Sequence, residues 1–309
     1  RTVGNYNIPV GDSYSHHRVE ITGHIDEIGL LVENESTKLF NNDFYVNVKG
    51  RVGANGILIE NPIDIIRDLV NHTAGLGFID SVKVKGTDEV TQFEAMDVDK
   101  SVIVNATTHT PVAEFKGEFG MGNLGFLSGI INLESYVADD ATVEVSMRER
   151  NGEQQPESIT FRDTFGNNDQ YRFMSKEIVE QQLKTVKFKG VNWDVTIEPS
   201  KPRVSELGAV ANIYSSITPT FSAKTDNKSL VFSIGSADSG GHFGKRTFAQ
   251  NVDGTLSQGW SWPLSQVLAI LKLGMSGMCV MQFSDQGALQ ISIDSGLGKY
   301  DYILPAMNQ

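Results

Sequence analysis

The 309-residue sequence is poor in cysteine, in long apolar runs and in positive charge. Its single cysteine, Cys279, excludes an internal disulfide framework, and its alternation with Met281 and Phe283 predicts a buried strand thiol rather than a nucleophile. No segment approaches the roughly 20 apolar residues of a membrane helix, so no membrane partner is expected. Lysine and arginine number 26 against 38 acidic residues, a net charge of −12. Adhesion to nucleic acid through overall charge is therefore not expected, although a local basic group can still contact phosphates.

Little in the sequence predicts chemistry at a catalytic site. The segment 238–246 (DSGGHFGKR) departs from a phosphate-binding loop, because Ser239 stands at the first glycine position and arginine follows the lysine. His16, His17 and His24 have no acidic or cysteine partners at metal-ligand spacing. We therefore expect no enzyme, no metal site and no cofactor.

What the sequence does contain is a repeated pattern of elements, clearest in the C-terminal half. Residues 191–198 alternate as a strand does, and 202–215 have apolar residues at helical spacing. Three strand-like segments follow, at 219–224, 229–235 and 245–252. The order then recurs, with a strand at 256–262, a helix at 263–273 and strands at 278–285, 288–295 and 300–306.

The helix predicted at 263–273 begins at a proline and has an apolar stripe formed by Leu264, Val267, Leu268 and Leu271. Its other face is almost uncharged and consists of Ser265, Gln266, Ala269 and Lys272. The stripe predicts a helix that packs one side against a sheet.

Two earlier copies of the pattern precede residue 175. One has strands at 101–108 and 111–119, a helix at 121–133, and strands at 141–150, 157–164 and 170–174. The other is less regular, with "GILIE" at 56–60, a helix at 61–72, and strands at 78–86 and 91–96. Asn61 is a plausible N-cap before Pro62 in that helix.

Single helices dispersed among many strands argue against a parallel doubly wound sheet. We predict an α+β fold of duplicated strand–helix–three-strand units, with antiparallel sheets covered by helices on one face. The predicted division is an N-terminal extension of unknown role at 1–43, a first domain at 44–174, a charged connector at 175–190 and a second domain at 191–309.

This organisation resembles the DNA sliding clamp family, which includes the T-even phage clamp and proliferating cell nuclear antigen. Segments similar to the phage branch are "SVIVNATTHTPVAEFKGEFGMGNLGFLSGIINLES" at 101–135, "ESITFRDTFGNNDQYRFMS" at 157–175 and "VNWDVTIEPSKPRVSELGAVANIYSSI" at 191–217. The closing segment, from "WPLSQVLAILKL" to "YDYILPA", is also similar. The resemblance covers about residues 55–309 and depends on the order of elements and the hydrophobic pattern.

The resemblance implies a processivity factor: a homotrimeric ring that encircles duplex DNA without reading its sequence and tethers replication proteins. It implies DNA polymerase and clamp-loader peptides as partners, and the cytoplasm of a phage host cell as the location. The basic residues on the helices that would face DNA are Arg67, Lys201, Arg203 and Lys272, whereas the helix at 121–133 has none.

The resemblance also implies a hydrophobic pocket for partner peptides beside the connector. The matching residues are Ile178, Val179, Leu183, Leu304 and Pro305. An alternative role for these side chains is to seal the core between the two domains, and the sequence leaves both open.

A function of another class also remains open. A β-rich virion component, such as a tail-tip, hub or baseplate protein, could reuse a clamp-like fold. The segment "FYVNVKGRVGANGILIENPIDIIRDLV" resembles segments of siphophage tail-tip proteins, and the acidic balance suits this alternative. A carbohydrate-binding sandwich would need exposed tryptophans, but Trp193, Trp260 and Trp262 are expected to be buried.

Overall fold

The computed structural model describes residues 62–137, 141–150, 152–183, 188–236, 241–275 and 277–307. The chain divides into two compact units, Arg1–Leu58 and Ile59–Gln309, and every described residue belongs to the second. The predictions for the extension at 1–43, for "GILIE" and for the three N-terminal histidines lie outside the described residues. The domain boundaries proposed from the sequence stay predictions.

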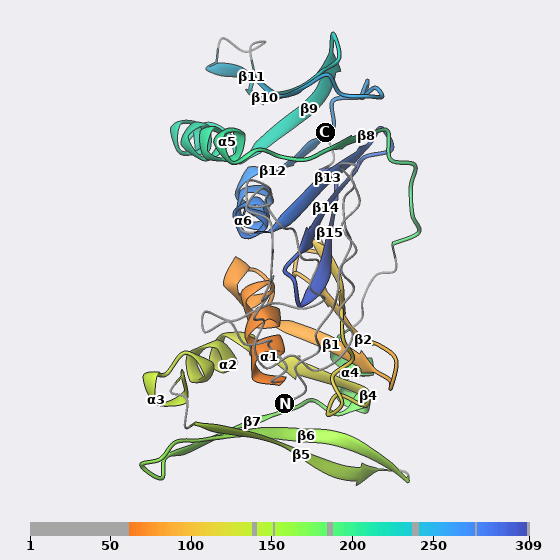
Figure 1. Ribbon diagram of the computed structural model, residues 1–309. Coiled ribbons are helices and arrows are strands. Elements are labelled where there is room, and N and C mark those ends of the chain that lie inside the picture. The colour runs from red at the N-terminus through yellow and green to blue at the C-terminus, as the bar shows by residue number, and fades with distance from the viewer. Residues whose placement is uncertain are drawn as a thin grey trace, which may run out of the picture. The chain divides into compact units, whose positions relative to one another are not determined.

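The described chain contains the predicted elements in order (Figure 1), but the strand predicted at 101–108 as the start of the second copy is β3, which pairs with β2 and closes the first group. The first group consists of α1 (Pro62–Asn71), η1 (Ala74–Leu76), β1 (Ser81–Gly86), β2 (Thr91–Met96) and β3 (Ile103–Thr108). The second consists of β4 (Gly117–Gly122), α2 (Leu124–Ile131), α3 (Glu134–Val137), β5 (Thr142–Arg150), β6 (Glu153–Arg162) and β7 (Asn168–Arg172).

After α4 (Lys176–Gln182), the second half repeats this arrangement. The third group consists of β8 (Val195–Ile197), α5 (Lys201–Tyr214), β9 (Thr220–Asp226), β10 (Ser229–Gly235) and β11 (Phe243–Gln250). The fourth consists of β12 (Ser261–Pro263), α6 (Leu264–Gly274), β13 (Met278–Ser284), β14 (Ala288–Asp294) and β15 (Gly298–Pro305). The α+β fold class with antiparallel sheets is confirmed.

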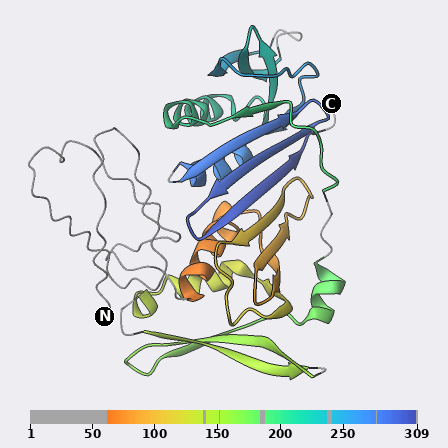
Figure 2. The ribbon, with the colours of Figure 1, turned by 45° about the vertical axis from the view of Figure 1, so that its right-hand side comes forward.

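The strands form three sheets. An eight-stranded sheet has the order β4-β1-β2-β3-β15-β14-β13-β8 and joins both halves through the antiparallel pair of β3 and β15 (Figure 2). A three-stranded sheet, β5-β6-β7, and a four-stranded sheet, β11-β10-β9-β12, lie at opposite ends of the unit. Every strand pair is antiparallel, as the two-residue periodicity predicts.

Strand pairing also supports the duplication. An isolated bridge joins Gly120 of β4 to Met174, just after β7, and a second joins Ser261 of β12 to Met307, just after β15. The two bridges connect corresponding strands of the second and fourth groups. They therefore align β7 with β15 residue by residue.

The apolar stripe of α6 is buried as predicted, with Leu264, Val267, Leu268 and Leu271 in the core. Cys279 is a buried strand thiol, and burial raises its pKa to about 12. A Cβ atom at Gly274 would lie 2.7 Å from the Cys279 sulfur, so the end of α6 needs glycine to approach β13.

Some predicted bounds were wrong. The helix predicted at 121–133 is α2, which starts at Leu124 because β4 extends to Gly122 and Asn123 has a left-handed backbone (φ 53°). Of the strand predicted at 111–119, only the part from Gly117 belongs to a strand, β4, because the segment before it turns and buries Phe115. The connector contains α4, which the charge of its sequence obscured.

Candidate functional site

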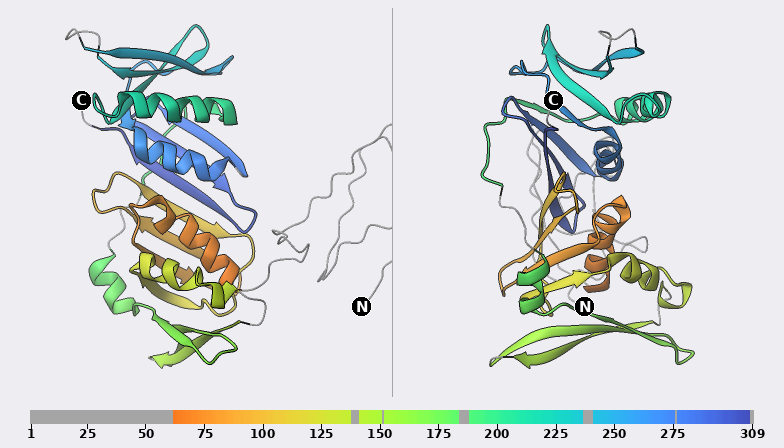
Figure 3. Two further views of the ribbon diagram at one scale, coloured as in Figure 1. Left: turned by 90° about the vertical axis from the view of Figure 1, so that its left-hand side faces the viewer. Right: turned by 180° about the vertical axis from the view of Figure 1, so that it is seen from behind.

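Four helices lie side by side on one face of the described unit, in the order α5, α6, α1 and α2 (Figure 3, left). Helix α5 packs beside α6, α1 packs beside α2, and α6 reaches η1. We call this surface the helix layer. Each helix buries its apolar side on the sheets, so its remaining side chains form a continuous outer surface.

The structure brings the four basic residues predicted to face DNA onto the helix layer. Arg67 of α1 forms an ion pair with Asp64 at 2.9 Å, and Arg203 of α5 forms one with Glu206 at 2.7 Å. Lys201, at the start of α5, and Lys272, in the last turn of α6, are exposed. Their role in DNA contact stays a prediction.

The rest of the layer is close to neutral. Helix α2 presents Gly125, Phe126 and Gly129 to solvent. The sequence placed Gln266 on the outer face of α6, but its side chain is held by other groups. The Gln266 amide donates a hydrogen bond of 2.8 Å to the Ser101 hydroxyl and lies 3.4 Å from an Asp97 carboxylate oxygen. It therefore joins α6 to the turn between β2 and β3.

The five residues predicted to form one partner pocket do not come together. Val179 of α4 is buried against Gly120, where a Cβ atom would lie 2.7 Å from the Val179 side chain. Leu304 is buried in β15, where its carbonyl accepts a hydrogen bond from the Trp262 indole at 3.1 Å. In the sheet, β1, β2 and β3 separate β4 from β15, so α4 and Leu304 pack at different places.

The remaining members of that predicted set follow the same division. Leu183 lies beside Gly120 with Val179, whereas Ile178 is exposed on α4. Pro305 pairs with Ala288 at the end of β15 and is exposed. Val179 and Leu304 are both buried, but Val179 packs on β4 and so does not seal the core between the two domains.

A buried polar cluster joins the two halves and was not predicted. Asp68 of α1 accepts hydrogen bonds from the hydroxyls of Tyr300 at 2.8 Å and Ser295 at 2.7 Å. His72 stacks on the Tyr300 ring at 4.1 Å, and the Tyr302 hydroxyl donates to the His72 carbonyl at 2.9 Å. We call these five residues the internal junction.

The internal junction fixes α1 against β15 across more than 220 residues of sequence. Burial and the facing Asp68 raise the pKa of Tyr300 well above its usual value, so the hydroxyl stays a donor at neutral pH. The available sequence signal was weak: Asp68 and His72 stand four residues apart, at the end of α1 and just after it.

Some of the large exposed apolar side chains lie at the two ends of the unit. Around the turn that precedes β7 they are Leu133, Val137 and Phe165, and near β11 they are Ile213, Ile217 and Phe243. We call these groups the β7 end and the β11 end. Within the described residues, β7 pairs only with β6 and β11 only with β10, so each end also has an open strand edge.

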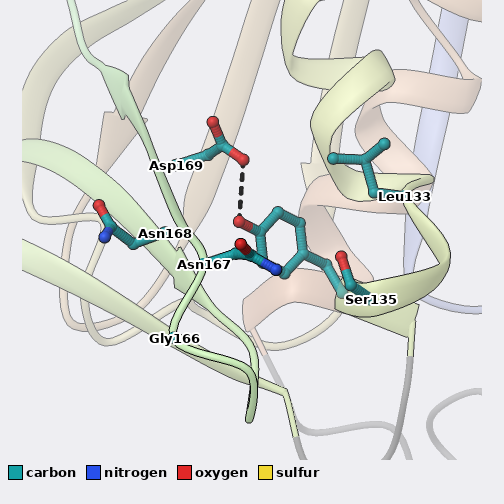
Figure 4. A pocket seen from close by; sticks show the side chains of 7 residues that line it. Leu133, Ser135, Gly166, Asn167, Asn168 and Asp169 are labelled. Carbon is teal, nitrogen blue, oxygen red and sulfur yellow. Dashed lines mark hydrogen bonds between the residues drawn. The ribbon is translucent and has the colours of Figure 1, made fainter.

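A shallow pocket of about 520 Å³ lies at the β7 end, between α3 and the turn that precedes β7 (Figure 4). Tyr136 forms its wall and donates a hydrogen bond of 2.8 Å to Asp169, marked by the dashed line. Burial and this bond raise the pKa of Tyr136 to about 12. The Asn167 side-chain amide holds the pKa of nearby Asp163 below its usual value.

Three further features of the described residues bear on the expectations from the sequence. Among the described residues, no group of three His, Cys, Asp or Glu could hold a metal ion. Trp262 is buried as expected, whereas Trp193 and Trp260 are half-buried. Within the same residues, no helix is long and apolar enough to cross a membrane.

No protein-family model and no curated protein matches the sequence. Solved structures do match the fold. PCNA from Thermococcus kodakaraensis aligns over 80% of this chain and 98% of its own, with 12% identity and a TM-score of 0.57. The chain has a sliding-clamp fold. A. fulgidus PCNA, solved with the C-terminal region of FEN-1 bound, aligns over 80% of this chain and 96% of its own, with 9% identity and a TM-score of 0.58.

The clamp fold confirms the predicted resemblance at the level of architecture. At these identities the likeness concerns the fold alone. It does not favour the alternative of a virion structural protein.

Proposed function

We propose that this chain forms a closed head-to-tail ring of three copies that encircles duplex DNA and tethers a replicative polymerase. The observation that supports this best is that the edge strands at the two ends of the unit are the repeat counterparts of two strands that pair with each other inside the chain. Inside the chain, β3 of the first group pairs with β15 of the fourth. Their counterparts are β11 of the third group and β7 of the second, and each of these is an edge strand of its sheet.

Head-to-tail pairing of β11 with β7 of the next copy would repeat the internal contact and cover both of these edges. A contact between two different surfaces closes into a ring when the rotation between copies allows it.

In such a ring the helix layer would line the hole, with Arg67, Lys201, Arg203 and Lys272 nearest the phosphates. Two of these four cations are already paired with carboxylates. We infer that the ring holds DNA mainly by enclosing it, with little counterion release and a shallow salt dependence. The chain would act without catalysis or a cofactor, in the cytoplasm of the cell that replicates the DNA.

Partner proteins would bind the outside of the ring. One of the similar structures holds the C-terminal region of FEN-1 on a PCNA, which supports peptide binding as a mode of recruitment. Polymerase and clamp-loader peptides are the proposed ligands here. The surface that receives them is not assigned to the five residues first predicted, because these lie apart.

The test is to thread the protein over the free ends of a linear duplex that carries biotin at both ends. Streptavidin is then added to block the ends, and the complex is washed with high salt. A ring should stay on blocked DNA and leave unblocked DNA, and electron micrographs should show a three-subunit ring with a central hole. A solid assembly, or equal loss from both DNAs, would contradict the proposal.

A further inference from the structure

Helices α1 and α5 occupy corresponding places but differ in what covers them. Both bury apolar residues at every third position: Ile63, Ile66 and Leu69 in α1, and Val204, Leu207 and Val210 in α5. This spacing aligns the two helices. Asp68 then corresponds to Ala209, and His72 corresponds to Ile213.

The aligned positions have opposite exposure. Asp68 and His72 are buried because β15 of the other half covers them. Ala209 is exposed, and Ile213 is 68% exposed. Helix α5 thus presents to solvent the side that α1 uses at the internal junction.

The surface that would cover α5 can be located by the same alignment. Because Met174 corresponds to Met307, Asp169 corresponds to Tyr302 and Asn167 to Tyr300. Asn167 and Asp169 line the pocket at the β7 end, and Leu133 forms its helix side (Figure 4). The pocket therefore stands where, in the other half, Tyr300 and Tyr302 receive α1.

We propose that Ile213 of one copy enters the pocket formed by Leu133, Tyr136 and Asp169 of the next copy. This rests on the proposed ring and names the contact that closes it. Ile217 follows Ile213 on the β11 end, and Val137 and Phe165 flank the pocket on the β7 end, so the apolar groups of both ends meet. Where the internal junction uses hydrogen bonds, the contact between copies adds the apolar side chains of Ile213 and Leu133 to a pocket that is otherwise lined mostly by polar groups.

The two contacts differ in whether they must separate. Buried hydrogen bonds between α1 and β15 are permanent parts of one fold. A contact between copies must separate when the ring opens, so its side chains must tolerate water. Ile213, which is already exposed on one copy, meets that requirement.

Cross-linking tests the contact directly. A chain carrying both Ile213→Cys and Leu133→Cys is treated with a short bismaleimide and run under denaturing conditions. Covalent dimers and trimers are expected, with a fast-migrating closed trimer when all contacts react. Native Cys279 should stay silent, because burial raises its pKa to about 12. Each single variant, and the pair Ile213→Cys with Val98→Cys, should give monomer only, since Val98 is an exposed apolar residue in the turn between β2 and β3.

A second variant measures the strength of the contact. Ile213→Asp should weaken assembly about 100-fold or more, because it places a charge in the apolar contact beside Asp169. Val98→Asp, an equal change away from both ends, should assemble as the unaltered chain does. Circular dichroism of Ile213→Asp should match the unaltered chain, because the side chain is exposed in the single copy.

The outcomes separate the two proposals. If the unaltered chain forms no ring, the proposed function and this contact both fail. If the ring forms and stays on blocked DNA, but the cysteine pair yields monomer only and Ile213→Asp assembles normally, the contact is wrong and the function stands. Cross-linked rings together with disruption by Ile213→Asp would establish the contact.

Discussion

The internal junction and the β7 end are two versions of one surface. In the first, Tyr300 donates to Asp68 and α1 covers both. In the second, Tyr136 donates to Asp169, and only solvent and the pocket lie beyond within the described residues. The comparison shows that the repeats place the same backbone arrangement at two sites. Different side chains make one site a contact within the fold and leave the other exposed.

The largest expected effect comes from exchanging the aligned residues of α1 and α5. Asp68→Ala removes the acceptor for Ser295 and Tyr300 and should lower the free energy of unfolding by about 2–4 kcal/mol. Ala209→Asp, the reciprocal change on α5, should stay within about 0.5 kcal/mol because the site is exposed. Urea unfolding at low protein concentration measures both. Equal losses would mean that the internal junction does not differ energetically from the open side of α5.

Loss of the Tyr300–Asp68 hydrogen bond should destabilise the chain more than loss of the Tyr136–Asp169 hydrogen bond. Tyr300→Phe leaves Asp68 with one hydroxyl donor fewer and should cost about 1–2 kcal/mol. Tyr136→Phe should cost less, about 0.5–1 kcal/mol, because water can reach Asp169 and replace the lost bond. The same urea titrations provide the measurement. A larger loss for Tyr136→Phe would reverse the comparison.

Alkaline pH isolates the contribution of the β7 end. The pKa of Tyr136 is raised from 10.0 to about 12, so its stabilising effect is complete below pH 10 and is lost as pH rises from 10 to about 12. Unfolding free energy should fall in that window, and it should fall less steeply in Tyr136→Phe than in the unaltered chain. Parallel curves for the two proteins would show that the pKa of Tyr136 is not raised in the folded chain.

The smallest effect on stability is expected from the exposed ion pair of α5. Glu206→Gln should change unfolding by no more than about 0.5 kcal/mol, because Arg203 and Glu206 are both partly solvated. Freed from its carboxylate, Arg203 should strengthen binding to linear duplex by about three- to tenfold at low salt and steepen the salt dependence. Fluorescence anisotropy measures this, with Glu89→Gln, in the turn between β1 and β2, as the matched loss of one exposed charge. Equal affinities for the two variants would remove Arg203 from the DNA-facing surface.

Much of the fold could be predicted from the sequence, because periodicity records which side of an element is buried. The stripe of α6 and the alternation around Cys279 each gave the correct element and the correct buried face. The predicted ends of helices and strands were wrong where local backbone geometry sets them. At Asn123, for example, a left-handed conformation separates β4 from α2. The helix α4 was missed because charged residues surround its buried Val179.

The candidate site was predicted less well. The four basic residues do share the helix layer, since each was assigned to a correctly predicted helix. Their pairing with Asp64 and Glu206 was not predicted, although the spacing of three residues on a helix allows it. The five residues predicted as one partner pocket lie apart, because Val179 of α4 packs on β4 whereas Leu304 lies in β15, and the sequence does not record how far these strands are separated in the sheet.

The sequence by itself determined the repeated strand–helix–strand pattern, the buried face of each element and the low positive charge of the helices. These are local properties, set by side-chain type and spacing along the chain. Only the tertiary structure decided that α1 is covered while α5 is open, since both helices have the same apolar spacing. That difference depends on which strands lie opposite: β15, which brings Tyr300 and Tyr302 to Asp68 and His72, covers α1, whereas no described strand covers Ile213.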